Sequence, residues 1–288
     1  MVKVSGFTII KNAISHDFPV EASIRSILPV CDEVIVNVGP STDGTMDLIK
    51  SIDDPKIKII EGVWDVSRQN WMLSDETLRA MRACSHPWGI YIQADEVLHE
   101  RGGPELVAAM AAVDADPRVE ALLVKYLHFY GDFNTIASNR RWYRREIRAI
   151  RLDPALDIRP YKAAQGFRVG PDNRKTRARL TTAEMFHYGW ARPAAALRAK
   201  IVTNRTIYPW SAEREAKRPL LPWIPGLKPF TGTHPAVAQS YIAERATDPE
   251  RVVEPPHFEL EHLRFYASDV IERLTGVRLW EYRNYRLV

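Results

Sequence analysis

The stretch Trp88–Glu100, WGIYIQADEVLHE, decides how the rest of the sequence is interpreted. Its first five residues are largely apolar and predict a short buried strand, which stops at Gln93, Ala94, Asp95 and Glu96. Two adjacent carboxylates are costly to bury without a partner, so this pattern favours a bound cation or polar ligand. Ligands of open α/β sheets collect at the carboxyl ends of strands. The alternative is that both carboxylates cap a helix or lie in a solvated loop.

Strand-like and helix-like segments alternate before this stretch. Strands are expected at 4–10, 33–38 and 56–60, and helices at about 18–29, 45–52 and 71–84. This alternation predicts an α/β fold with a mostly parallel central sheet, right-handed crossovers and flanking helices. The sequence has no GxGxxG after the first strand and no GxxxxGK[ST], which argues against a dinucleotide-binding domain and a P-loop.

The second half of the chain changes in character after residue 206. Before that point we expect a helix at 105–113, strands at 121–129, 141–151 and 184–190, and a helix at about 193–206. Six prolines lie between residues 209 and 235 and forbid a long helix or a central strand there. Helices are again expected at about 235–247 and 259–275. We therefore predict a domain over 1–206 and a Pro-rich arm with a helical extension over 207–288.

The net charge of +4 is unevenly distributed. Residues 1–139 carry 12 Lys and Arg against 20 Asp and Glu, whereas residues 140–179 carry 13 against 4. Such a basic segment suggests an anionic partner, and the alternative is a solvated Arg-rich strand face.

No apolar run approaches the roughly 18 residues of a membrane span. Two cysteines, Cys31 and Cys84, make no disulfide framework, which favours the cytoplasm.

Three motifs, taken in order, resemble family 2 glycosyltransferases, which are nucleotide-sugar enzymes of the GT-A fold. They are the first strand with its Lys11-Asn12 end, the segment DEVIVNVGPSTDGT at 32–45, and YIQADEVLHE at 91–100. The resemblance covers 4–130 well and 131–206 weakly. It implies a hexosyltransferase-type enzyme that moves a sugar from a nucleoside-diphosphate donor to an unknown acceptor, with inversion at the anomeric carbon.

The resemblance also implies which residues contact the donor. The nucleotide would lie against Ile10, Lys11, Asn12, Asp43, Gln93 and Ala94. Gln93 departs from the family pattern, in which an Asp often contacts the ribose, and it brings no charge. For Asp43, the alternative is a turn residue that stabilises its own backbone.

A divalent metal is the cofactor that the resemblance implies. Asp95, paired with Glu96 in the motif, matches the usual metal ligand, and it would hold the ion on the diphosphate leaving group. A distal His ligand occurs in some GT-A enzymes, and His187 is the candidate here. Hard cations such as Mg²⁺ and Mn²⁺ prefer oxygen ligands, so an imidazole ligand would favour Mn²⁺. The alternative for His187 is a hydrogen-bonded core histidine.

An inverting transfer needs a general base that takes the proton of the acceptor hydroxyl. Asp132, just after a strand, and Glu184, three residues before His187, are the candidates, and either could instead be an ordinary exposed carboxylate. The basic segment could meet an anionic acceptor or the diphosphate through Arg144 and Arg148, and a loop over 165–180 could close on the donor.

Other functions fit the sequence less well. A nucleotidyltransferase would carry a Gly-rich basic signature near the first strand, where this chain has SGFTIIKNA. A non-catalytic nucleotide-sugar or anion-binding protein remains an alternative because Gln93 weakens the motif. We expect no nucleic-acid partner, since the N-terminal half is acidic. The acceptor could be an anionic glycan, a lipid-linked group or a protein, and we expect a cytoplasmic protein or a peripheral membrane one.

Overall fold

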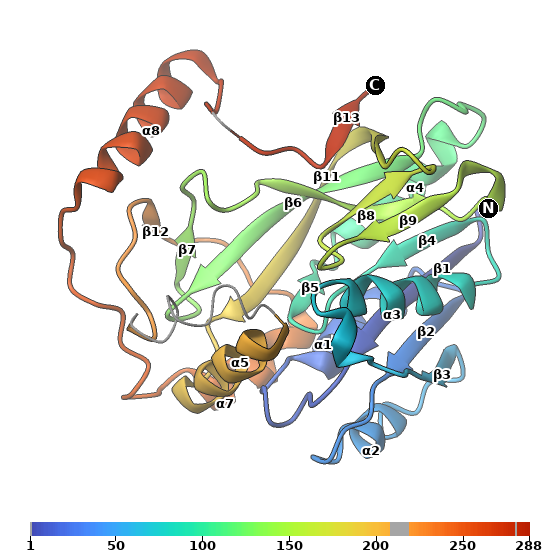
Figure 1. Cartoon of the computed structure of the whole chain (residues 1–288), viewed down its shortest axis with the longest axis horizontal. Helices are drawn as coiled ribbons and strands as arrows, with labels where there is room; N and C mark the ends of the chain where they lie inside the picture. The colour runs from blue at the N-terminus through green and yellow to red at the C-terminus, as the bar shows by residue number, and fades with distance from the viewer. Residues whose placement is uncertain (1, 208–218, 280) are drawn as a thin grey trace.

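One sheet organises the chain. The computed structural model describes residues 2–207, 219–279 and 281–288, and the strands within these ranges join into a 13-stranded sheet (Figure 1). The first strands along the chain follow the predicted alternation with helices: β1 (Val4–Ile10), α1 (Val20–Ile27), β2 (Glu33–Val38), α2 (Thr45–Lys50), β3 (Ile57–Glu61), α3 (Trp71–Arg82) and β4 (Trp88–Tyr91). These four strands are parallel, in the order β3-β2-β1-β4. The predicted α/β class is confirmed.

The sheet continues beyond β4 through β8 (Arg145–Arg151), β6 (Ala121–Tyr130) and β11 (Arg174–Trp190). β8 is antiparallel to both β4 and β6, whereas β11 is parallel to β6. Six of the seven strands from β3 to β11 therefore run in one direction, and their carboxyl ends lie along one edge. That edge is where an α/β sheet binds its ligands.

Short strands complete the sheet at its rim. They are β5 (Glu96–Leu98), β7 (Thr135–Ala137), β9 (Ile158–Tyr161), β10 (Gly166–Val169), β12 (Leu227–Pro229) and β13 (Tyr285–Leu287). Single 3₁₀ turns occupy Val66–Arg68, Pro154–Leu156, Ala236–Ala238 and Leu260–His262. The expected loop over 165–180 is instead the hairpin of β10 and β11, so β11 begins ten residues earlier than predicted. The carboxylate of Glu120 holds this hairpin through Arg174 and Arg177.

The remaining helices agree with the predicted ranges. They are α4 (Gly102–Val113), α5 (Ala194–Ile207), α7 (Gln239–Arg245) and α8 (Leu263–Thr275). The Pro-rich stretch lies partly outside the described residues, and its described part contributes β12, which pairs with β7. β13 pairs with β11, so the segment after residue 206 adds strands to the same sheet. The domain division at 206 remains a prediction.

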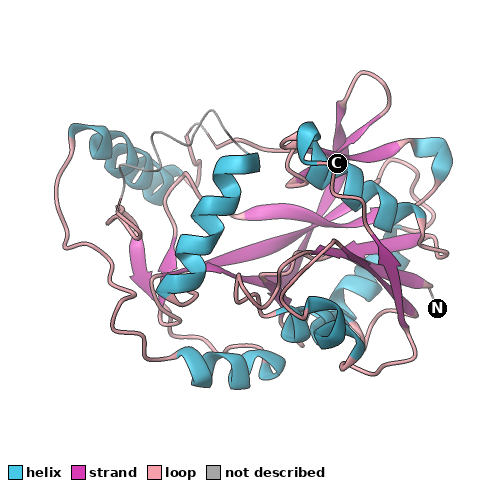
Figure 2. Cartoon of the chain, turned by 60° about the horizontal axis from the view of Figure 1, so that its bottom comes forward, coloured by secondary structure: helices cyan, strands magenta, loops and turns pink. Residues whose placement is uncertain are grey.

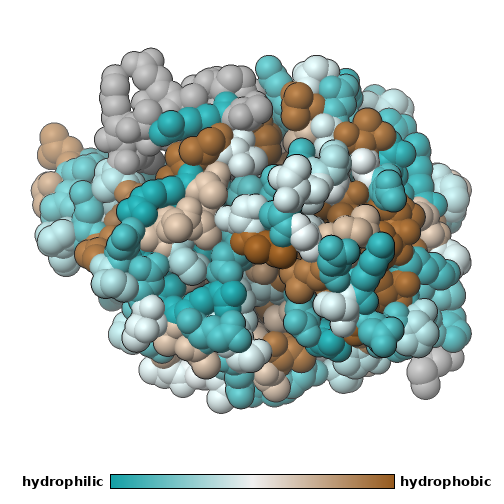
Figure 3. Space-filling view, turned by 90° about the horizontal axis from the view of Figure 1, so that it is seen from below, coloured by the Kyte–Doolittle hydropathy of each residue, from teal (hydrophilic) through white to brown (hydrophobic). Residues whose placement is uncertain are grey.

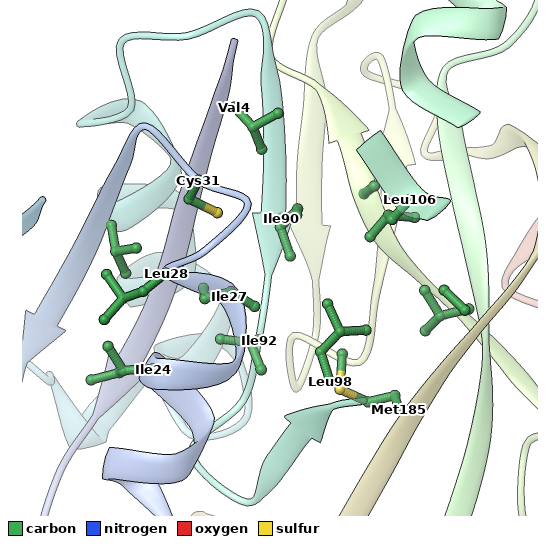
Figure 4. Packing of buried hydrophobic residues seen from close by; sticks show 14 of the residues in the cluster. Val4, Ile24, Ile27, Leu28, Cys31, Ile90, Ile92, Leu98, Leu106 and Met185 are labelled. Atoms are coloured by element: carbon green, nitrogen blue, oxygen red, sulfur yellow. The ribbon is translucent and has the colours of Figure 1, made fainter. Parts of the chain in front are cut away.

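Helices cover both faces of the central sheet (Figure 2). On one face, α1 and α4 pack against alternate residues of β1 and β4, with Ile24, Ile27, Ile90 and Leu106 in a shared cluster (Figure 4). On the other face, α3 packs against the intervening residues, including Phe7 of β1. This alternation follows from the two-residue period of a strand.

Hydrophobic and hydrophilic side chains are interspersed on the face seen from below (Figure 3). None of the helices in the described part of the chain is both long and apolar enough to cross a bilayer.

A buried ion pair fixes the loop that follows β4. Arg148 of β8 donates two hydrogen bonds to the carboxylate of Glu96, at 2.9 and 2.8 Å, and both side chains are 0% exposed. The same carboxylate accepts the Tyr126 hydroxyl at 2.7 Å and the backbone N–H of Gln93 at 3.0 Å. Glu96 is therefore saturated by protein partners, and its role is to hold the loop in place.

We expect Arg148→Met to lower the free energy of unfolding by about 3–5 kcal/mol, because it leaves the Glu96 carboxylate buried without its partner. Urea unfolding measures this loss. Arg273→Ala is the matched control, since Arg273 is 73% exposed beside Asp269, and it should change stability by less than about 0.5 kcal/mol. Equal losses in both variants would contradict the assigned role of the buried pair.

Candidate active site

Asp95 lies in the loop after β4, at the edge formed by the carboxyl ends of the strands. Its backbone carbonyl accepts the N–H of Tyr188 of β11 at 2.9 Å, which joins the loop to that strand. Its side chain is largely buried, and the Oδ2 atom lies 3.6 Å from Nε2 of His187. The structure therefore brings together the two residues predicted as metal ligands, one after β4 and one on β11.

The hydrogen bonds of His128 determine which ring nitrogen of His187 donates a proton to His128. His128 Nε2 contacts the carbonyl oxygen of Tyr143 at 2.8 Å, and since a carbonyl can only accept, this nitrogen carries the proton. Burial and the nearby His187 hold the pKa of His128 well below its usual value, so His128 is neutral and its Nδ1 accepts. The 3.0 Å contact between the two Nδ1 atoms then requires His187 to donate. With Nδ1 as the donor to His128, the Nε2 atom of His187 is the nitrogen that faces Asp95, and in the neutral imidazole it carries the lone pair.

Two acceptor atoms that face each other fit a cation. Ligand atoms of one ion at about 2.1 Å can be as much as roughly 4.2 Å apart, and these two are 3.6 Å apart. Gly189 leaves the adjoining space open, because a Cβ there would lie 2.6 Å from His187 Nε2 and 2.8 Å from Asp95 Oδ2. The donor set of one carboxylate and one imidazole thus fits a divalent metal that takes its other ligands from a diphosphate.

Two cations that the sequence analysis did not identify complete this site. Lys200 of α5 places its Nζ 3.7 Å from Asp95 Oδ2 and donates to the Gly189 carbonyl at 3.2 Å. Arg192, which is fully buried, donates to the carbonyls of Gly189 and His16. No local motif announces either residue, and they reach the site because α5 follows directly from the end of β11.

These neighbours set the charge state of the site. Burial alone would raise the pKa of Asp95, but the interaction with His187 when its imidazole is protonated, together with the charges of Lys200 and Arg192, holds it well below its usual value. Burial and the charge of Arg192 lower the pKa of Lys200 to about 8, although Asp95 opposes this shift. Asp95 is therefore a carboxylate at neutral pH, in a strongly cationic setting.

The loop after β1 supplies the predicted nucleotide contacts in part. Ile10 is 1% exposed and packs in the core, so its side chain is not available to a ligand. Lys11 is half-buried, with its ammonium 5.6 Å from the centre of the Trp64 ring. Asn12 has a left-handed backbone, with φ of 52°, and its N–H donates to Ser41. The buried indole N–H of Trp64 has no hydrogen-bond partner among the described residues, so it can donate to a polar ligand beside Lys11.

Hydrogen bonds within the protein occupy both oxygens of the Asp43 carboxylate. Oδ1 accepts the N–H and the hydroxyl of Thr45, and Oδ2 accepts the N–H and the hydroxyl of Ser15. Burial would raise its pKa, but these four hydrogen bonds lower it to about 2. The carboxylate joins the β1 loop to the start of α2, which favours the structural interpretation over contact with the nucleotide.

Gln93 and Ala94 lie beside Asp95 in the same loop. The Gln93 amide donates to the Tyr91 hydroxyl and to the carbonyl of Ala164, both at 3.4 Å, and the residue is half-buried. Ala94 is 8% exposed and belongs to the core cluster, so it offers a ligand little more than backbone. Contact of these residues with a nucleotide remains a prediction.

Among the described contacts, neither candidate base touches the proposed metal ligands. The Asp132 carboxylate accepts the N–H of Asn134 at 2.8 Å, as in a turn-stabilising Asx arrangement. Glu184 pairs in regular register with Lys125 of β6, three positions before His187 pairs with His128. Because side chains of a strand alternate, Glu184 and His187 point to opposite faces of the sheet.

The basic segment is largely neutralised within the protein. Arg144 forms ion pairs with Glu272 and Glu281, both at 2.8 Å, and lies just before β8 rather than within it. Arg148 pairs with Glu96. Carboxylates distant in the sequence therefore bind both Arg144 and Arg148, so the face formed by these two residues is not free for an anionic acceptor or the diphosphate.

Comparison with known proteins gives distant likenesses only. No protein-family model and no curated protein matches the chain. The structure of S. aureus TarS 1–349 aligns with a TM-score of 0.42 at 12% identity, over 70% of this chain and 65% of that one. Glucosyl-3-phosphoglycerate synthase from Mycobacterium tuberculosis, in complex with Mn²⁺, UDP and phosphoglyceric acid, aligns with a TM-score of 0.29 at 19% identity, over 44% and 43%. The chain spans less than two thirds of the length of either protein, and the functional argument rests on the site itself.

Gly189→Ala should abolish the binding of Mn²⁺ at this site, because the added methyl group would lie against both ligand atoms. Isothermal titration with Mn²⁺ measures the effect. Glu184→Gln, on the same strand but the opposite face, is the control and should bind Mn²⁺ as the parent protein does. Retained Mn²⁺ affinity in Gly189→Ala would place the ion elsewhere.

The pKa of Asp43 predicts acid sensitivity. Its folded value of about 2 lies below the ordinary value of 3.8, so its stabilising effect is complete above pH 4 and is lost as the pH falls toward 2. We expect Asp43→Asn to be less stable by about 1–2 kcal/mol at pH 7, since the amide nitrogen cannot accept from Ser15. Thermal unfolding between pH 2 and 7 should show this difference shrinking with acidity. A constant difference would contradict the account.

Proposed function

We propose that this chain is a glycosyltransferase of the GT-A fold that moves a sugar from a nucleoside-diphosphate donor to an acceptor hydroxyl with the help of a divalent metal. The observation that carries the proposal is the pair formed by Asp95 Oδ2 and His187 Nε2, 3.6 Å apart across the open position at Gly189. The pair lies where an α/β sheet binds ligands, beside the β1 loop.

The transfer breaks the bond between the anomeric carbon and a diphosphate oxygen, and negative charge develops on that oxygen. A bound divalent cation would supply Lewis-acid stabilisation of this charge. Lys200 supplies a second positive charge from α5, and its burial strengthens the interaction because little water screens it. Asp95 would hold the divalent ion, and it lies 3.7 Å from Lys200. The imidazole of His187 favours Mn²⁺ over Mg²⁺.

The acceptor hydroxyl must lose a proton as its oxygen bonds to the anomeric carbon. An inverting reaction assigns this proton to a protein base, and Asp132, which follows the carboxyl end of β6, is our candidate. Rotation of its side chain away from the Asn134 N–H would free it for this role.

Because Cys31 and Cys84 are free thiols, we assign the protein to the cytoplasm.

A panel of nucleotide sugars tests the proposal through thermal shift with and without Mn²⁺. A donor that binds only the folded state raises the melting temperature, and Asp95→Ala should remove this metal-dependent rise. Product analysis separates the alternatives, since from a nucleotide sugar a glycosyltransferase releases a nucleoside diphosphate, whereas transfer of the nucleotidyl group would release a sugar 1-phosphate. Equal stabilisation of the parent protein and Asp95→Ala would refute the assigned site.

We further expect Lys200→Ala to lower kcat about 100-fold while Mn²⁺ affinity is kept, because it removes a charge that acts on the leaving group. Lys200→Arg should recover part of the activity. Steady-state kinetics with the donor identified by the panel provide the measurement. Unchanged kcat in Lys200→Ala would mean that the lysine has only a structural role.

A further inference from the structure

A cavity of about 450 Å³ opens beside the candidate active site, between β6, the Asn139–Tyr143 turn and the segment after residue 219. Three tryptophans line it: Trp142, Trp190 and Trp223. The rings of Trp142 and Trp190 are almost perpendicular, at 89° with centroids 6.5 Å apart, and so form a corner. Trp223 is held by His262, with ring centroids 5.4 Å apart. The size and aromatic lining of the cavity are those of a small-molecule pocket.

Carboxylates outnumber arginines among the described residues that line this cavity. They are Glu254, Glu259 and Glu261, with one arginine, Arg141, and two histidines, His257 and His262. Arg141 donates to Glu261 at 3.1 Å, and His257 Nε2 lies 3.2 Å from Glu259, so two of the three carboxylates have a partner. The described lining is therefore rich in hydrogen-bond acceptors and suits ligands that donate hydrogen bonds or carry positive charge.

Two chains of contacts connect the cavity to the proposed metal ligands. Trp190 lies under Lys200, with the ammonium 5.0 Å from the ring centre, and Lys200 contacts Asp95. Trp142 packs against His128, with centroids 5.0 Å apart, and His128 contacts His187. The Lys200 side chain thus separates Trp190 from Asp95, and the His128 side chain separates Trp142 from His187.

We propose that this cavity is the acceptor subsite and that it binds a saccharide which is neutral or carries an amine. This inference rests on the proposed function and names the class of its second substrate. The indole faces would pack against the apolar C–H face of a sugar ring. The carboxylates would accept its hydroxyl or ammonium protons. The basic segment had suggested an anionic acceptor, but Arg144 and Arg148 are paired with carboxylates, and the described lining of this cavity has more carboxylates than arginines.

The charges near the two subsites support this arrangement. Lys200 and Arg192 lie at Asp95, where they would attract the diphosphate of the donor. The carboxylates of the cavity would disfavour entry of the same diphosphate. A phosphorylated or uronic-acid acceptor would meet a like charge at Glu254.

A glycan array tests the inference on the full chain with immobilised neutral, amine-bearing and acidic glycans, in the presence of EDTA so that binding through a metal is excluded. We expect the retained glycans to be neutral or amine-bearing. Trp223→Ala should weaken their retention at least tenfold, and Trp71→Ala is the matched control because it removes an exposed tryptophan outside the cavity. Glu254→Lys should weaken the retention of amine-bearing glycans, and it serves as the second variant if Trp223→Ala does not fold.

The inference is overturned if no glycan is retained, if acidic glycans are the retained class, or if Trp223→Ala and Glu254→Lys both bind as the parent protein does. Thermal shift with nucleotide sugars and Mn²⁺ on the same variants keeps this outcome separate from the proposed function. Donor binding without glycan retention would reject the acceptor subsite alone. Glycan retention without any donor binding would reject the transferase assignment.

Discussion

The ion pair between Glu96 and Arg148 is the constraint on which the rest of the site depends. It joins the start of β5, just after the loop that follows β4, to strand β8, and both charges are fully buried, so neither can be solvated if the other moves. Through the N–H of Gln93, the same carboxylate fixes the backbone that carries Asp95. Adjacent carboxylates thus have opposite roles. Glu96 is saturated by the protein, which leaves Asp95 facing His187, Lys200 and a possible ion.

The region around Asp95 also shows why α5 belongs to the site. Arg192 connects the carbonyl of Gly189 to that of His16, and Thr203 of α5 contacts His16 Nε2 at 2.8 Å. These contacts join the end of β11, the loop after β1 and α5 into one unit. A ligand bound at Asp95 would therefore meet groups from the first strand, the fourth strand and the helix after β11 together. Such convergence is what a donor with a base, a diphosphate and a sugar requires.

Much of the fold could be predicted from the sequence, because the strands and helices before β4 have clear periodicity. The resemblance also singled out Asp95 and His187, which the structure places 3.6 Å apart, and their binding of a metal stays a prediction. The arginine partners could not be predicted. Glu281 and Glu272 lie more than 120 residues from Arg144, and only the folded chain brings them together. Lys200 could not be predicted as a site residue for the same reason, because local periodicity does not show which helix residue reaches a distant strand end.

The central claim is that Asp95 and His187 bind one divalent ion. Pulsed electron paramagnetic resonance of Mn²⁺ bound to the protein, with each common nucleoside diphosphate in turn, tests it most directly. The account predicts nitrogen modulation from an imidazole ligand with at least one nucleotide, lost in His187→Gln, and no bound Mn²⁺ in Asp95→Ala. Bound Mn²⁺ without nitrogen modulation, or the same spectrum in Asp95→Ala, would contradict it.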